Sequence, residues 1–435
     1  MKHYRIVRIV PLSYQGAILN FYVKNPGIHT KSYDIQLTEL LQQKYSYTDS
    51  FSRAMRAIGN DAFELIYDFK DLQIIWAKEK NVKINEKNWQ TEVILAQIKD
   101  IRPDIIFFQD IHSLPYTVRS QLKSLFPFVK LIVYFRGYPG GDPQFIRKEF
   151  GDADVLLVGS PILLEKCTSV GLKPYMIYHS FDDDILIKLS SNDNLNNQSF
   201  YDFTFLGSSG YGYGKGHSMR YWILEELIRR TILQCWLDER SNIKLNQTFF
   251  NMSLKLFIRT LLKNILEDYN PWILHGIENA NWMPGNIRRI AHKIDRPQRN
   301  EFIPTKPLYK KYPSRCYQSK YGIEMYRILK QSKITLNIHS NNANGTVDNL
   351  RLFQATGVGT CLLTDTGANM KDLFIEDREI VTYSSIEECI EKVTYLLEHD
   401  DVRREIARAG QQRTLRDHTA LNRCMQIDEI LQKML

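Results

Sequence analysis

Side chains able to carry acid–base chemistry stand at the ends of apolar runs in the first half of the sequence. Asp110 and His112 follow the run "DIIFFQD", and Arg136 ends the next run, "KLIVYFR". A carboxylate or an imidazole within hydrogen-bond reach of a hydroxyl group can take its proton, and a guanidinium can hold an anion. We predict that Asp110, His112 and Arg136 are catalytic, the alternative being that each is structural.

A glycine-rich loop in the second half offers a different chemistry, the binding of phosphate. In "FLGSSGYGYGKGHSMR" a predicted strand runs through five glycines into a helix. Free backbone N–H groups and the positive end of the helix dipole would meet there. The loop matches neither the dinucleotide fingerprint nor a P-loop, so a flexible loop remains the alternative. The predicted ligand-binding residues here are Gly207, Ser208, Ser209 and Arg220.

The stretch "LNIHSNNANGTVDNLRLFQATGVG" predicts a strand ending at His339, a loop and then a helix. Thr346 or Asp348 would be a reasonable N-cap. One interpretation is an ordinary helix-to-strand corner. The other is that the amides of Gly345, Thr346 and Val347 receive a diphosphate, because open α/β sheets bind ligands at this edge.

A basic region runs from Arg288 to Lys320 and has tyrosines interleaved with its lysines and arginines. It is either a solvated surface or a contact for a phosphate-rich acceptor, a diphosphate or an anionic lipid surface. No recognised nucleic-acid module surrounds it, so we expect no nucleic-acid partner. Nowhere do His, Cys and acidic residues have the spacing of a metal site, and we expect none.

Strands alternating with helices must position these residues, which predicts an α/β fold with parallel, doubly wound sheets. A region rich in Asp, Asn and Ser, from Asp182 to Asp202, separates two such alternations and is the predicted linker. The predicted strands are Tyr4 to Val10, Phe63 to Phe69, Asp104 to Asp110, Lys130 to Arg136, Asp154 to Ser160, Phe203 to Ser209, Trp272 to Ile277, Ile334 to Ser340 and Thr360 to Asp365. The predicted helices include Trp89 to Ile101, Met219 to Arg230, Ile386 to Glu398, Val402 to Gln412 and Leu421 to Leu435. For the segment Leu227 to Phe257, a helical insertion is one interpretation, and we assign the segment no function.

Length and composition agree with two cores. A chain of 435 residues exceeds one ordinary core, and its 43% hydrophobic content is normal for a globular protein. Six isolated cysteines are expected to be reduced thiols. No window reaches the roughly 18 apolar residues of a membrane span, and the N-terminus lacks a signal-peptide core. We expect a cytoplasmic protein, and the formal charge of +8 suggests anionic partners, including the inner face of a membrane.

The second half of the chain resembles the C-terminal domain of glycosyltransferases. The likeness is carried by "YGIEMYRILKQSKITLNIHS", "NLRLFQATGVGTCLLTD" and "EIVTYSSIEECIEKVTYLLEHDDVRREIARAGQQRTLRDHT". These segments are similar to GT-B enzymes of the spore-maturation-protein-like group, which is related to glycosyl transferases group 1 and is family 4-like. The first half resembles such enzymes in architecture, including "PDIIFFQD" and "YMIYHSFD".

The resemblance implies the GT-B fold, two Rossmann-like domains facing a cleft. An acceptor-side domain would span residues 1–195, a donor-binding domain 196–412, and a helix in 413–435 would return to the first domain. The implied substrates are a nucleotide-sugar donor and the hydroxyl of a glycan or lipid-linked acceptor. Related enzymes need no metal or other cofactor, because helix amides and basic side chains neutralise the leaving diphosphate. The broader class suggests a retaining reaction.

The family's Asn-x-Arg-x-x-Glu-Ala corner falls on Asn349, Arg351, Gln354 and Ala355. In the family that glutamate usually bonds the donor ribose, and the broader class has a second acid eight positions earlier, here Thr346. Gln354 can still accept a hydrogen bond but carries no charge. The resemblance therefore implies a glycosyltransferase in the synthesis of a cell-surface polysaccharide, lipopolysaccharide or related glycan. A catalytically silent sugar-nucleotide-binding protein and a nucleotide-sugar epimerase remain alternatives.

Overall fold

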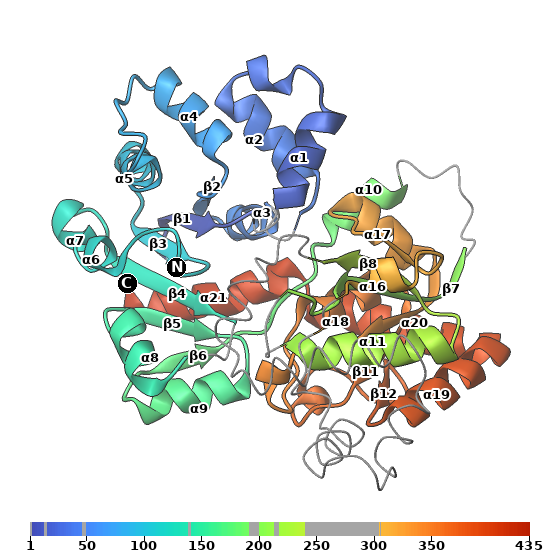
Figure 1. The fold of residues 1–435 in the computed structure, drawn as a ribbon. Coiled ribbons are helices and arrows are strands. Elements are labelled where there is room, and N and C mark those ends of the chain that lie inside the picture. Colours follow the sequence, from blue (N-terminus) through green and yellow to red (C-terminus); the bar gives the residue numbers. More distant parts are fainter. Residues whose placement is uncertain are drawn as a thin grey trace, which may run out of the picture.

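The computed structural model describes residues 2–12, 15–45, 49–137, 141–190, 200–212, 217–239, 304 and 306–435. Two α/β domains face each other in Figure 1, joined by extended segments near the middle of the view. The predicted strand Trp272 to Ile277, most of the basic region and residues 240–257 lie outside the described residues.

The N-terminal domain is built on a six-stranded parallel sheet of order β2-β1-β3-β4-β5-β6. The strands are β1 Arg5–Val10, β2 Asp61–Ile66, β3 Ile105–Phe108, β4 Leu131–Arg136, β5 Val155–Val158 and β6 Pro174–Met176. Its helices are α1 Gln15–Lys24, α2 Tyr33–Gln42, α3 Ser50–Ala57, α4 Lys70–Glu79, α5 Trp89–Ile101, α6 Tyr116–Arg119, α7 Leu122–Leu125, α8 Pro143–Phe150 and α9 Pro161–Ser169. Strands β3, β4 and β5 are buried along their whole length, which is why they read as continuous apolar runs.

The C-terminal domain repeats the design with the order β12-β11-β10-β7-β8-β9, again all parallel. The strands are β7 Tyr201–Ser208, β8 Gln234–Asp238, β9 Cys316–Gln318, β10 Ser332–Asn337, β11 Cys361–Asp365 and β12 Val381–Tyr383. The helices are α10 Asp184–Ser190, α11 Ser218–Arg230, α16 Leu308–Lys311, α17 Ile323–Lys330, α18 Leu350–Gly357, α19 Ile386–Glu398 and α20 Asp400–Asp417. The predicted parallel, doubly wound sheets are therefore confirmed.

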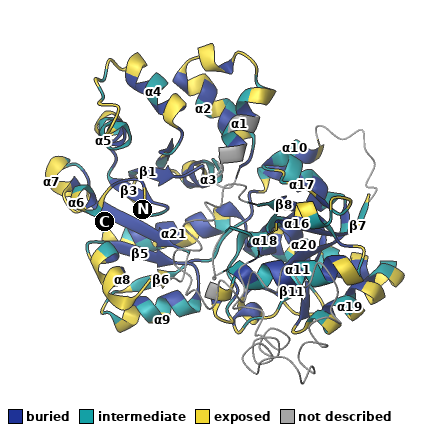
Figure 2. Cartoon of the chain, viewed as in Figure 1, coloured by how far each residue is buried: buried dark blue, intermediate teal, exposed yellow. Residues whose placement is uncertain are grey.

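The last helix, α21 Ala420–Met434, lies against the N-terminal domain although it follows the C-terminal one (Figure 1). Its buried side chains, among them Cys424 and Ile427, join an apolar cluster with Tyr4 and Phe107. The hydroxyl of Tyr4 donates a hydrogen bond to Asp428 at 2.6 Å. Figure 2 shows buried strands at the centre of each domain and exposed residues on the outer helices.

Several elements differ from the sequence-based prediction. β8 falls inside the segment for which a helical insertion had been one interpretation, and α10 falls inside the predicted linker. The strands β6, β9 and β12 have three residues each and too few apolar side chains to be recognised. All six cysteines are free and buried, as expected. Within the described ranges, no helix is long and apolar enough to cross a bilayer.

Candidate active site

A candidate site lies where the C-terminal sheet reverses its strand order. β7 pairs with β8 on one side and with β10 on the other, so the strand order runs in opposite directions from β7. Ligands of doubly wound sheets bind at the carboxyl ends of such a strand pair. A cavity of about 310 Å³ opens there between the ends of β7 and β10. We call it the switch-point cavity. Of the predicted donor-binding residues, Gly207, Ser208, Arg220, Asn349, Arg351 and Gln354 line it.

Two arginines are fixed at the wall of this cavity by carbonyl groups. The Arg220 guanidinium donates to the carbonyl oxygens of Ser208 at 3.3 Å and Ile338 at 2.8 Å, joining the ends of β7 and β10. Arg351 donates to the carbonyl oxygen of Leu206 at 2.9 Å. These bonds fix the position of each guanidinium at the cavity wall. The arrangement suits an anionic group such as a diphosphate.

Gln354 stands at the junction of two cavities. Its side chain amide donates to the hydroxyl of Tyr326 at 3.1 Å, and the residue is 7% exposed. Asn349, just before α18, donates to the Asn337 side chain oxygen at 2.7 Å. These two members of the predicted family corner are therefore held by neutral hydrogen bonds, and both line the switch-point cavity.

The loop before α18 is bonded to its own surroundings. The amide of Val347 donates to the side chain oxygen of Asn369 at 2.8 Å, and the amide of Thr346 donates to the Ala343 carbonyl at 2.9 Å. Gly345 lies at a φ of +77° and accepts a hydrogen bond from the Ala368 amide. None of the three lines the described cavities, so their predicted contact with a diphosphate stays a prediction.

The N-cap of α18 is Asn349, not Thr346 or Asp348 as predicted. The backbone stays extended at Asn349, with φ −83° and ψ 153°, so the helix begins one residue later than an Asp348 cap requires. Ser209 also differs from its predicted setting. It is fully buried and its hydroxyl donates to Glu239 at 2.7 Å, away from the cavity wall that Ser208 forms.

Lys44 and Tyr45 form the N-terminal wall of the switch-point cavity, and no sequence pattern predicted this. Lys44 is 1% exposed and its ammonium contacts the carboxylates of Asp49 at 2.8 Å, Asp182 at 3.0 Å and Asp184 at 2.8 Å. Burial lowers its pKa, but these carboxylates outweigh burial and raise the pKa above its ordinary value. This ion cluster fixes the loop after α2 to the segment that enters the C-terminal domain.

Trp236 and Asp238 from β8, and Tyr321 after β9, complete the walls that were not predicted. The Trp236 ring packs against Tyr317 with ring centres 5.0 Å apart. Lys320, the last member of the predicted basic region, also lines the cavity, with a side chain that is 46% exposed. The cavity thus combines an aromatic wall and cationic groups with one carboxylate, that of Asp238.

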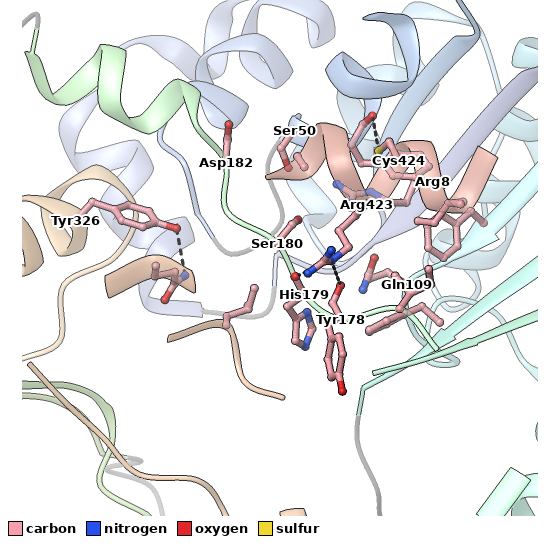
Figure 3. Close-up of a pocket in the computed structure, with 18 residues that line it drawn as sticks. Arg8, Ser50, Gln109, Tyr178, His179, Ser180, Asp182, Tyr326, Arg423 and Cys424 are labelled. Atoms are coloured by element: carbon pink, nitrogen blue, oxygen red, sulfur yellow. Dashed lines mark hydrogen bonds between the residues drawn. The ribbon is translucent and has the colours of Figure 1, made fainter. Parts of the chain in front are cut away.

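A second, smaller cavity of about 100 Å³ is lined by Arg8 and Gln109 of the N-terminal domain and by Gln354 and Arg423. Figure 3 labels Arg8, Gln109 and Arg423 around it. We call it the hinge cavity. Because Leu350 and Gln354 line both cavities, the two adjoin each other. Arg8 is bonded to the buried carboxylate of Glu64 at 2.8 Å.

Arg423 of α21 holds the segment around Tyr178 and His179, which precedes the C-terminal domain. Its guanidinium donates to the carbonyl oxygens of Tyr178 at 3.0 Å and His179 at 3.1 Å, and to the ring nitrogen Nδ1 of His418 at 2.6 Å (Figure 3 labels Arg423, Tyr178 and His179). Burial, reinforced by the nearby Arg423 charge, lowers the pKa of His179 to about 4. Burial also lowers the pKa of His418 to about 4, so both imidazoles are neutral at pH 7.

The predicted catalytic residues lie on the N-terminal domain, outside both cavities. The carboxylate of Asp110 accepts hydrogen bonds from the Tyr67 hydroxyl at 2.9 Å and from the backbone amide of His112 at 2.7 Å. The guanidinium of Arg136 lies over the rings of Phe145 and Phe150. Gln109, next to Asp110, lines the hinge cavity. Their catalytic role stays a prediction.

His339 is a further predicted donor-binding residue and ends β10. Its ring nitrogen Nδ1 lies 2.7 Å from the carboxylate of Asp365 on β11, and its backbone amide donates to the same carboxylate at 2.9 Å. The side chain is 5% exposed and does not line the described cavities, although the preceding Ile338 does.

Comparison with known proteins agrees with this geometry. Residues 306–429 match a protein-family model described as "Glycosyl transferase-like". This range contains the family corner from Asn349 to Gln354, so the predicted resemblance of this part of the chain is confirmed. A search of curated proteins finds no significant match.

Solved structures extend the likeness to the whole chain. A glycosyltransferase from Rickettsia africae superposes with a TM-score of 0.52 at 11% identity, covering 100% of this chain and 99% of its own. Sucrose-phosphate synthase from Thermosynechococcus elongatus gives 0.53 at 11% identity, with coverage of 100% and 99%. HepE from Anabaena, solved with UDP-glucose, gives 0.55 at 9% identity, with coverage of 99% and 100%. At such identities the likeness concerns the fold, and the fold of this chain is GT-B.

Proposed function

We propose that the protein is a glycosyltransferase that moves a sugar from a nucleotide-sugar donor to a hydroxyl group of an acceptor. The observation that carries the proposal is the switch-point cavity, which in a GT-B fold holds two carbonyl-fixed arginines beside an aromatic wall. The match of residues 306–429 to a glycosyltransferase-like family supports it, as does the similar fold of HepE, which was solved with UDP-glucose.

In this proposal Arg220, Arg351 and Lys320 hold the diphosphate. The base and ribose occupy the side of the cavity formed by Trp236 and Tyr321. The acceptor oxygen bonds to the anomeric carbon of the sugar while the bond from that carbon to the diphosphate breaks. The acceptor proton passes to a base, and the leaving diphosphate is stabilised by the cationic groups, which offset its charge without a metal ion.

The proposal extends to the acceptor, the stereochemistry and the location. The acceptor approaches from the N-terminal domain through the hinge cavity, with Asp110 or His112 as base or positioning group, and the reaction retains the anomeric configuration. The acceptor belongs to a cell-surface polysaccharide, lipopolysaccharide or related glycan. In this proposal the protein acts in the cytoplasm, and its formal charge of +8 favours contact with an anionic membrane that carries a lipid-linked acceptor.

Thermal unfolding of the full chain with nucleotides tests the donor site. A ligand at about 100 times its dissociation constant stabilises the native state by about 2.7 kcal/mol. We expect UDP, GDP or dTDP, or one of their sugar conjugates, to raise the melting temperature. Failure of every nucleotide and nucleotide sugar to do so would refute the proposal.

A catalytically silent binding protein is the second candidate, and Gln354 is the observation that favours it. At the position where the resemblance leads one to expect an acid, the amide of Gln354 is bonded to Tyr326. Donor hydrolysis or transfer by the purified protein would exclude this candidate. A large gain of turnover in Gln354→Glu, starting from an inactive protein, would instead support it.

A further inference from the structure

Two of the free cysteines are neighbours in the C-terminal sheet. Cys235 of β8 and Cys316 of β9 are partners in the parallel register of these strands. Both side chains belong to the same buried apolar cluster, so they rise from the same face of the sheet. Their thiol groups interact with each other. A pair of thiols held side by side in this way is a candidate for disulfide formation.

The geometry of the two strands allows such a bond. Neighbouring strands lie about 4.7–4.9 Å apart, within the range of about 4.4–6.8 Å between the Cα atoms of a disulfide. The Cβ atoms of a disulfide are only about 3.5–4.5 Å apart, so forming the bond draws the strands together. β9 has three residues and lies at the edge of the sheet, whereas β8 is paired on both sides. β9 is therefore the strand that we expect to move.

The surroundings of the pair keep it reduced at rest. Cys235 is fully buried and Cys316 is 6% exposed. Burial, reinforced by the neighbouring Cys316 thiol, raises the pKa of Cys235 well above its ordinary value. Since the thiolate is the reactive form of cysteine, we expect slow reaction, and only with an oxidant that reaches Cys316 at the edge of the sheet. In a reducing compartment, protein disulfides are usually transient ones of this kind.

The position of β9 relates the thiol pair to the switch-point cavity. The strand runs directly into residues 319–322, which line the cavity. Trp236, next to Cys235, also lines it and packs against Tyr317 of β9. We propose that Cys235 and Cys316 form a reversible disulfide in response to a peroxide, and that this bond displaces residues 319–322 and weakens nucleotide binding. The second part rests on the proposed function, and the first part is independent of it.

The reaction balances with hydrogen peroxide as the oxidant. The oxygen–oxygen bond breaks as one oxygen joins the sulfur of Cys316, which gives a sulfenic acid and water. The sulfur of Cys235 then bonds to this sulfur, and the sulfenic hydroxyl group leaves with the Cys235 proton as a second water. The two thiols lose two electrons, and the peroxide gains them. A small-molecule thiol reverses the step by attacking the disulfide.

Thiol titration of the full chain after treatment with hydrogen peroxide tests the first part. We expect the wild type to lose two of its six thiols and to regain both with dithiothreitol, and peptide mapping to join Cys235 to Cys316. Cys316→Ala should keep all its remaining thiols, because it has lost the partner of Cys235. The control is Cys361→Ala, which removes a buried thiol from β11 of the same sheet and should still lose two thiols on oxidation.

Calorimetric titration with UDP and GDP, before and after oxidation, tests the second part. The nucleotide that binds the reduced wild type should bind the oxidised protein about tenfold more weakly, the effect of losing a hydrogen bond to a charged group. Dithiothreitol should restore the affinity. Cys316→Ala should bind the nucleotide equally well with and without peroxide treatment.

The outcomes separate the disulfide from the proposed function. If the wild type keeps all six thiols, or if other cysteines are joined, the proposal is overturned whether or not a nucleotide binds. If the bond forms and nucleotide affinity is unchanged, the link between the thiol pair and the cavity is overturned. If no nucleotide binds the reduced protein, the proposed function fails and this link fails with it, while the thiol titration still decides whether the disulfide exists.

Discussion

Removing the negative charge of Asp348 should stabilise the protein in the absence of ligand. The carboxylate is buried, its Oδ2 lacks a hydrogen-bond partner among the described residues, and its pKa rises from 3.8 to about 6. A difference of about two pKa units corresponds to about 3 kcal/mol by which folding disfavours the ionised form. Asparagine at position 348 keeps the shape and removes that charge, so Asp348→Asn should gain up to about 3 kcal/mol at neutral pH.

The sign of the effect sets its pH dependence. Because the folded state binds this proton more tightly than the unfolded chain, the destabilisation is absent below pH 3.8, grows between pH 3.8 and about 6, and is complete above pH 6. The stability advantage of Asp348→Asn over the wild type should therefore be largest at pH 7.5 and shrink as the pH falls towards 4.

Thermal unfolding followed by circular dichroism, without nucleotide, measures this difference. For a domain of about 200 residues, 1 kcal/mol shifts the melting temperature by about 2–4 °C, so a gain of about 3 kcal/mol should raise it by roughly 6–12 °C at pH 7.5. Asp401→Asn should melt within about 1 °C of the wild type, because its carboxylate is exposed. A melting temperature of Asp348→Asn equal to or below that of the wild type would refute the reasoning, and so would a gain that persists unchanged at pH 4.

Three further substitutions test the cleft and the hinge. Gly322→Ala should lower the melting temperature and weaken nucleotide binding, because a Cβ there would lie 2.0 Å from the Gln43 carbonyl oxygen across the domain contact. The control is Gly171→Ala, which is also at positive φ but has open space around it and should cost only about 1 kcal/mol of stability. Arg351→Met should weaken UDP or GDP binding by about tenfold or more in calorimetry, and equal affinity would remove this residue from the diphosphate site. His418 has a pKa of about 4 in the folded state against 6.5 in the unfolded chain, so up to about 3 kcal/mol of the free energy of unfolding should be lost as the pH falls from 6.5 to 4. Urea unfolding at several pH values should show a flatter pH dependence of stability for His418→Asn than for the wild type. Equal pH dependence in the two proteins would contradict this.

The sheets could be predicted because their central strands are buried on both faces. Strands such as β4 and β5 are uninterrupted apolar runs for that reason, and the sequence alone places them almost at their observed ends. β8 reads "QCWLD", with polar residues at both ends and only three buried positions, so it carries too weak a pattern to separate from a helix. Edge strands of three residues have no period to detect.

Only the wall of the switch-point cavity that the C-terminal domain forms could be predicted from the sequence. Arg220 and Arg351 follow strand-to-helix connections of the C-terminal sheet, so their place at its carboxyl edge follows from topology. Lys44 comes from the other domain, and its position depends on contacts between residues far apart in the chain. The backbone amide of Ile323 donates to the carbonyl oxygen of Gln43 at 3.0 Å, and no local pattern encodes that contact.

The neutral side chain of Gln354 can be explained by its buried position beside the start of α18. The resemblance leads one to expect acids at positions 346 and 354, and this chain has Thr346 and Gln354 there. A carboxylate is nevertheless present between them, since Asp348 is buried beside His339 with an oxygen that bonds to no described residue. Gln354, only 7% exposed and bonded to the Tyr326 hydroxyl, keeps its hydrogen bond without placing a charge in a buried position. A carboxylate there would be removed from water, which raises its pKa and destabilises the folded protein at neutral pH. Gln354→Glu should therefore lower the melting temperature of the protein without nucleotide at pH 7.5, and an unchanged melting temperature would contradict this reasoning.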